Sequence, residues 1–63
     1  MTTYTAGDRV ELISTNDLYT WLRPGMLGIV RFVDDLGTIH IAWDDGSRLG
    51  MVLDAGDRIR KIG

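Results

Sequence analysis

The sequence has no cysteine, a single histidine and a single proline among its 63 residues. Disulfide bonds are therefore excluded, and one histidine gives little basis for a metal site. The lack of cysteine fits a reducing compartment. No apolar run exceeds three residues, and the segment 1–6 lacks the basic start and apolar stretch of a signal peptide. We therefore expect a cytoplasmic protein that makes no membrane contact.

Positive charge is also scarce, because the chain has seven basic and nine acidic residues and a net charge of −2. A chain with this balance has no general electrostatic attraction to nucleic acid or to anionic lipid. Its length allows one domain with one small core. We expect an N-terminal extension over residues 1–6 and a single domain over residues 7–63.

What the sequence does contain is a series of short apolar runs separated by clusters of Gly, Asp, Asn and Ser. This pattern is typical of successive hairpins and predicts strands over 8–14, 26–33, 38–43, 48–53 and 58–62. Alternation places Val10 and Leu12 inward in the first strand, and Ile39, Ile41 and Trp43 inward in the third. Gly28 predicts a bend or a close backbone approach inside the second strand.

The first connection, over residues 15–25, is long and has no clean period, so we expect a loop, with a short helical turn as the alternative. Pro24 and Gly25 suit a type II turn at its end. The Asp45–Gly46 pair predicts a tight hairpin, and residues 54–57 predict a turn, with one 3₁₀ turn as an option. Five short strands with one long loop predict an all-β barrel, and an open meander is the main rival.

Three segments carry a resemblance to a known family: Gly7–Ser14, Leu22–Val30 and Asp34–Gly50. Together they resemble the DUF4314 family of bacteria, archaea, phages and mobile elements. The resemblance implies a small five-stranded SH3-like barrel with a long first loop, and it carries no established activity or catalytic residue. More distantly, residues 28–30 resemble the glycine-valine step of KOW motifs, and residues 43–46 resemble the tryptophan-aspartate-x-glycine turn of Mib-type domains.

The residues that usually carry catalysis do not form a convergent set in this sequence. There is no cysteine nucleophile and no phosphate-binding glycine loop with a lysine. We expect His40 to be an outward-facing strand residue beside Thr38 and Ala42. The acidic pairs at 34–35 and 44–45 are expected to form turns, because they lack the ligand order of a calcium loop. The prediction is a protein without enzymatic activity, cofactor or metal.

Aromatic residues gather in the long loop, although the whole chain has only two tryptophans, two tyrosines and one phenylalanine. Tyr and Trp are favoured anchors at interfaces, and loops often carry binding residues. The candidate partner-binding residues are Leu18, Tyr19, Trp21 and Trp43. The alternative is that the loop caps the core: packing is favoured for Leu18 and Leu22, exposure is slightly favoured for Tyr19, and Trp21 stays open. Trp43 shares a face with Ile39 and Ile41, which favours a core position.

A second candidate surface is basic. If the first and last strands pair, five residues form a modest stripe, namely Arg9, Arg31, Arg58, Arg60 and Lys61. Such a stripe could bind nucleic acid, and the simpler interpretation is a solvated strand edge that resists aggregation. The leading hypothesis is a non-catalytic module that binds a protein, a peptide or itself. Because the family occurs in phages and mobile elements, a further hypothesis is that the chain is an accessory protein that binds a host or virion protein.

Overall fold

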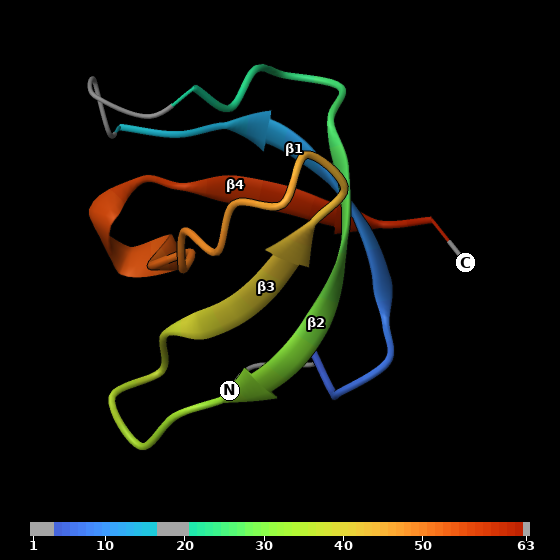
Figure 1. The fold of residues 1–63 in the computed structure, drawn as a ribbon. Coiled ribbons are helices and arrows are strands. Elements are labelled where there is room, and N and C mark those ends of the chain that lie inside the picture. The colour runs from blue at the N-terminus through green and yellow to red at the C-terminus, as the bar shows by residue number, and fades with distance from the viewer. Residues whose placement is uncertain (1–3, 17–20, 63) are drawn as a thin grey trace.

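A computed structural model describes residues 4–16 and 21–62 of the chain. Within these residues four antiparallel strands form one sheet in the order β3-β2-β1-β4 (Figure 1). The strands are β1 (Arg9–Ser14), β2 (Leu27–Val33), β3 (Ile39–Trp43) and β4 (Arg58–Lys61), and one 3₁₀ turn, η1 (Leu53–Ala55), precedes β4. The predicted all-β class is confirmed, and the described residues form a curved sheet that does not close on itself.

The core lies on one face of this sheet, as the alternating patterns of the sequence predicted. Val10 and Leu12 of β1 are fully buried, and β3 buries every second residue from Ile39 to Trp43. Leu12 faces Ile59 across the β1–β4 pair. Two buried residues from outside the strands, Leu22 and Met51, complete the core. The core as a whole consists of Val10, Leu12, Leu22, Val30, Ile39, Ile41, Trp43, Met51 and Ile59.

Gly28 permits the close approach that its position in the second strand predicted. It pairs with Val10 on one side and with Trp43 on the other. A methyl group at this position would lie 2.6 Å from Ile41 Cγ2 and 2.9 Å from Trp43 Cε3. The register of β2 against β3 also shifts between Val30 and Phe32, which marks a bulge in this strand.

The strand predicted over residues 48–53 is reduced to a single bridge between Met51 and Ile39. The backbone groups beside this bridge bind side chains instead of a neighbouring strand. The carbonyl of Leu49 accepts the indole N–H of Trp43 at 2.9 Å, and the N–H of Val52 donates to Asp57 Oδ2 at 3.0 Å. In Figure 1 this segment returns alongside β3 toward η1.

The predicted turns are present. Met26 N–H donates to the Arg23 carbonyl, and Gly25 has a φ of 96°, as a type II turn requires. Asp34 and Asp45 each accept backbone N–H bonds from residues further along their own turns, which confirms both as turn formers. The turn after Val52 includes η1, so the 3₁₀ option is confirmed.

The described part of the N-terminal segment packs on the sheet. Tyr4 contacts the core, and its hydroxyl donates to the carbonyl of Ile59 at 3.2 Å. The ammonium of Lys61 lies 5.7 Å from the centre of the Tyr4 ring. In the described part of the chain, no helix has the length and apolar character needed to cross a bilayer.

Candidate protein-binding site

Trp21 is the most exposed aromatic side chain among the described residues, with 83% of its surface accessible. Its neighbour Leu22 is buried and joins the core, as predicted for that leucine. The chain after Leu22 is held to β1, because Gly25 N–H donates to the Leu12 carbonyl and Leu12 N–H donates to the Met26 carbonyl, both at 2.8 Å. Trp21 therefore projects from a fixed attachment point.

Of the other residues of the predicted aromatic site, the structure describes only Trp43. Leu18 and Tyr19 lie outside the described residues. Trp43 is only 3% exposed and donates its indole N–H to Leu49 inside the fold. The structure confirms the core interpretation of Trp43 and removes this residue from the candidate site, because a side chain so covered offers no surface to a partner.

A groove of about 470 Å³ lies where the end of β1 meets the start of β4, and it is lined by Ile13, Leu53, Asp57, Arg58 and Ile59. The pairing of β1 with β4 shifts register between Leu12 and Ser14, so Ile13 stands at a bulge. Ile13 and Leu53 are 40% and 41% exposed. Two accessible aliphatic side chains therefore border a hollow of the size that small ligands and peptide side chains use.

Asp57 holds this region together. Its Oδ1 accepts the hydroxyl of Thr15 at 2.9 Å and the N–H of Asn16 at 3.0 Å, while Oδ2 accepts the N–H of Val52. The amide of Asn16 also donates to the carbonyl of Ala55. The start of the 15–25 loop, the segment before η1 and the start of β4 are thus fixed to one carboxylate.

The hydrogen bonds to Asp57 also set its ionisation. Partial burial acts to raise the pKa of this carboxyl, but the donors from Val52, Asn16 and Thr15 outweigh it and lower the pKa below its ordinary value. Asp57 is therefore ionised at neutral pH, and its negative charge is already satisfied by donors of the chain itself.

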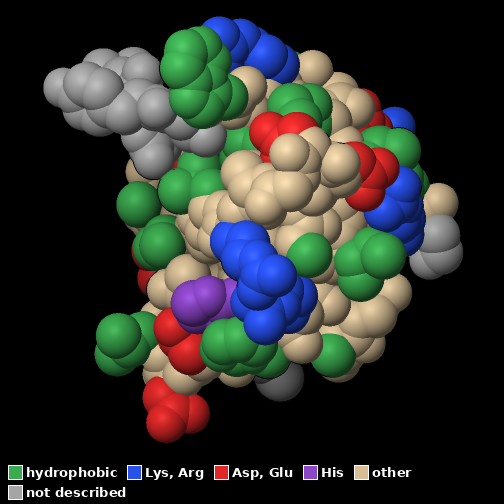
Figure 2. All heavy atoms as spheres, viewed as in Figure 1, with side chains coloured by type: hydrophobic (Ala, Val, Ile, Leu, Met, Phe, Trp, Pro, Cys, Tyr) green, Lys and Arg blue, Asp and Glu red, His purple; other side chains and the backbone are tan. Residues whose placement is uncertain are grey.

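The five residues of the predicted basic stripe are brought to one sheet, since β1 pairs with both β4 and β2. Three of them meet carboxylates. Arg9 binds Asp44 with two nitrogens at 3.0 and 2.8 Å, Arg60 lies 2.6 Å from Glu11, and Lys61 lies 3.2 Å from Asp8. Figure 2 shows a face of the molecule on which basic, acidic and hydrophobic side chains are mixed.

Arg31 and Arg58 are the two members of the stripe that have no ion pair among the described residues. The guanidinium of Arg31 lies 5.9 Å from the centre of the Phe32 ring. Arg58 is exposed and lines the groove. A stripe in which carboxylates are interleaved with the cations presents little net charge to a phosphate backbone.

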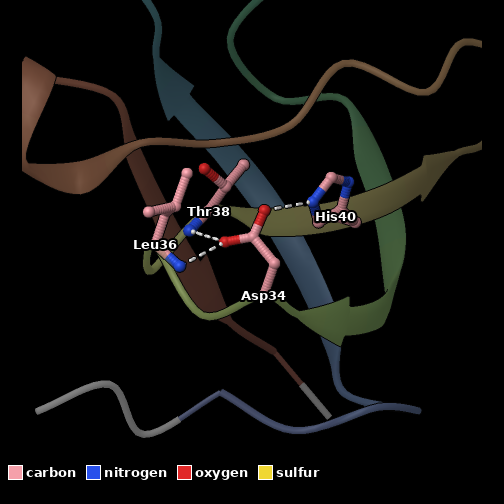
Figure 3. Close-up of polar contacts among 4 residues, drawn as sticks. All are labelled: Asp34, Leu36, Thr38 and His40. Carbon is pink, nitrogen blue, oxygen red and sulfur yellow. Dashed lines mark hydrogen bonds and ion pairs between the residues drawn. The ribbon is translucent and has the colours of Figure 1, made fainter.

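His40 has a partner that the sequence did not reveal. Its Nε2 lies 2.9 Å from Oδ2 of Asp34, whose Oδ1 accepts the N–H groups of Leu36 and Thr38 (Figure 3). The imidazole also stacks on Phe32, with ring centres 4.3 Å apart. The hydrogen bond from His40, with smaller contributions from Thr38 and Leu36, lowers the pKa of Asp34 against partial burial. These contacts fasten the turn to β3.

Among the residues that the structure describes, no three His, Cys, Asp or Glu side chains lie close enough together to hold a metal ion. Sequence reasoning missed the groove altogether. Its one local signal was Ile13, an isoleucine that alternation places outward beside Arg9 and Glu11. The contacts of Asp57 with Asn16 and Thr15 join residues 41 and 42 positions apart, and no local pattern in the sequence predicts them.

Comparison with known proteins adds the family. The model of a family described as "Domain of unknown function (DUF4314)" matches residues 1–62. No curated protein and no solved structure matches the chain.

Proposed function

Because the chain belongs to the DUF4314 family, whose description states no activity, its role has to be argued from its surface, and we propose that it is a non-catalytic protein-interaction module. Its contact surface is Trp21 together with the groove that borders the 15–25 loop. The observation that carries the proposal is the exposure of Trp21, 83%, on a loop whose ends are hydrogen-bonded to Asp57 and to Leu12 of β1.

An exposed indole beside a fixed backbone is favourable for binding. Burying an aromatic side chain in a partner removes a large apolar area from water, and tryptophan is enriched among the residues that dominate interface energetics. Leu22 in the core and the backbone bonds of Gly25 and Met26 limit the freedom of the adjacent chain. Less conformational entropy is therefore lost when a partner covers Trp21.

We also infer that the fold is an SH3-like barrel in which the fifth strand is reduced to the Met51–Ile39 bridge. Two features support this. The segment after β3 returns along the free edge of β3, and η1 leads directly into β4 at the opposite edge of the sheet. In barrels of this kind the long loop after the first strand often forms one wall of a peptide groove, which agrees with the position of the groove beside Asn16 and Asp57.

Nucleic-acid binding receives less support, because Arg9, Arg60 and Lys61 already face Asp44, Glu11 and Asp8. A phosphate backbone would have to compete with these carboxylates at three of the five stripe positions. The partner classes that remain are a host or virion protein, if the chain is a phage or mobile-element accessory, and a second copy of the chain. Both would use the same surface.

The test is a nuclease-treated pull-down with wild type, Trp21→Ala and Leu36→Ala. Leu36 is a matched control, because it is 91% exposed on the turn after β2. We expect protein partners that bind wild type and Leu36→Ala and are lost with Trp21→Ala. The same order should hold for the purified partner in calorimetry, or for the dimer in light scattering if the partner is a second copy. Equal binding by all three proteins, or recovery of material only without nuclease, would contradict the proposal.

A further inference from the structure

The groove between β1 and β4 has an uneven chemistry. Ile13 and Leu53 contribute accessible aliphatic surface, and Ile59 extends this surface into the core. The register shift between β1 and β4 lies at Ile13, one of the residues that line the groove, so regular pairing is interrupted at this point. Two of the three aliphatic residues, Ile13 and Ile59, therefore belong to the sheet, and the third, Leu53, comes from η1.

The two charged residues that line the groove differ in whether their side chains already have partners within the chain. Asp57 accepts three hydrogen bonds from Thr15, Asn16 and Val52, so its oxygens are committed to holding the fold. Arg58 is exposed, and its backbone pairs with Ser14 of β1, but its guanidinium has neither a hydrogen bond nor an ion pair among the described residues. This contrasts with Arg60, two residues later on the same face of β4, which is bound to Glu11. The groove thus presents one uncommitted cation beside three aliphatic side chains.

We propose that this groove binds an acidic aliphatic segment of a partner protein. A carboxylate of the segment pairs with Arg58, and a neighbouring Leu, Ile or Val side chain packs on Ile13, Leu53 and Ile59. The proposal rests on the proposed function and names the chemistry of its partner. The carboxylate comes either from an Asp or Glu side chain or from the C-terminus of the partner, since both offer the same planar pair of oxygens to a guanidinium.

The size of the hollow agrees with this assignment. A volume of about 470 Å³ accommodates one or two side chains and not a folded element. A basic segment is disfavoured because it would place a cation against Arg58, and a wholly apolar segment would leave the guanidinium without a partner when water is displaced.

The experiment uses ¹⁵N-labelled protein titrated with three blocked peptides, acetyl-Gly-Leu-Glu-Leu-Gly-amide and its Gln and Lys counterparts, and with acetyl-Gly-Leu-Gly-Leu carrying a free C-terminus. We expect the Glu peptide or the free-terminus peptide to shift the amides of Ile13, Leu53 and Arg58, with affinity about tenfold above that of the Gln peptide. The more effective of the two identifies the source of the carboxylate. Equal effects of all four peptides, shifts confined to other regions, or no shifts at millimolar peptide would overturn the proposal.

Charge reversal provides the second arm. Arg58→Glu should lose the acidic peptide and gain the Lys peptide, whereas Arg48→Glu, the same change at an exposed residue outside the groove, should leave the preference as in wild type. Arg58→Gln replaces Arg58→Glu if the latter does not fold. If Trp21→Ala abolishes capture of the natural partner and Arg58→Glu does not, the interaction module stands and the groove assignment fails. If neither variant affects capture, both proposals fail.

Discussion

The two tryptophans of this chain occupy opposite environments. Trp43 is 3% exposed and Trp21 is 83% exposed. Trp43 alternates with Ile39 and Ile41 along β3, and its indole N–H donates to the Leu49 carbonyl, so both its apolar and polar parts are satisfied inside the fold. Trp21 stands in a loop, and its neighbour Leu22 takes the core position instead. Strand periodicity decides the location of an aromatic residue, and where periodicity ends only the three-dimensional attachment of the loop decides it.

The largest expected effect is the loss of the buried tryptophan. Trp43→Ala should lower the free energy of unfolding by about 3 to 5 kcal/mol, because it opens a cavity and leaves the Leu49 carbonyl without its donor. For a chain of this length that loss abolishes most of the folded population. Chemical denaturation followed by circular dichroism measures it, with Trp43→Phe as the milder comparison. An effect below 1 kcal/mol would contradict the packing described for β3.

The next largest effect comes from a substitution that adds a methyl group beside Trp43. Gly28→Ala should destabilise the fold by about 3 kcal/mol, since the added methyl group meets Ile41 Cγ2 and Trp43 Cε3 below ordinary contact distance and lies 3.1 Å from the Ala42 carbonyl oxygen. Thermal unfolding measures the loss. In a Trp43→Leu background the cost of Gly28→Ala should fall, and an unchanged cost would place the strain on Ile41 and the backbone alone.

A smaller effect concerns the attachment of the loop that carries Trp21. Asp57→Ala removes three hydrogen bonds and should cost about 2 kcal/mol at neutral pH. Because the pKa of Asp57 is lowered in the folded state, its contribution is present above the ordinary value of 3.8 and is lost as pH falls through the folded pKa. Urea unfolding of both proteins at pH 7 and well below 3.8 should show the difference shrink. A difference that persists unchanged in acid would rule out the ionised carboxylate as its source.

The smallest effect belongs to the exposed tryptophan. Trp21→Ala should change stability by less than about 0.5 kcal/mol, because its side chain contributes little to the core. In Trp43→Phe protein the remaining indole should emit as a solvated tryptophan and be quenched readily by acrylamide. In Trp21→Phe protein the emission should be blue-shifted and protected. Similar quenching of the two variants would mean that the contrast between the tryptophans does not hold in solution.

The sequence predicted the strands best where hydrophobic alternation is regular, as in β1 and β3. It failed over residues 48–53, where Leu49, Met51 and Leu53 also alternate. The reason lies in distant side chains: Trp43 takes the Leu49 carbonyl and Asp57 takes the Val52 N–H, so only Met51 remains paired with β3. Propensity at those positions favours a strand, and tertiary hydrogen bonds override it.

The candidate site was predicted in part. The loop and the importance of Trp21 followed from composition, but the groove did not, because it depends on a register shift at Ile13 and on Asp57 reaching residues far away in the sequence. The ion pairs of Arg9, Arg60 and Lys61 likewise join residues 35 to 53 positions apart, since Lys61 meets Asp8. The sequence around a charged residue does not show whether an oppositely charged side chain from a distant segment pairs with it.

The position of β1 between β2 and β4 has a consequence for how the chain acquires its structure. The strand made early in synthesis needs a partner from the far end of the domain, and Glu11 and Arg60 are 49 residues apart. Until β4 has emerged from the ribosome, β1 keeps one edge unpaired and Leu12 lacks its facing residue Ile59. This sheet is therefore complete only once β4 is available to pair with β1, by a loop closure that places folding on the order of milliseconds to seconds.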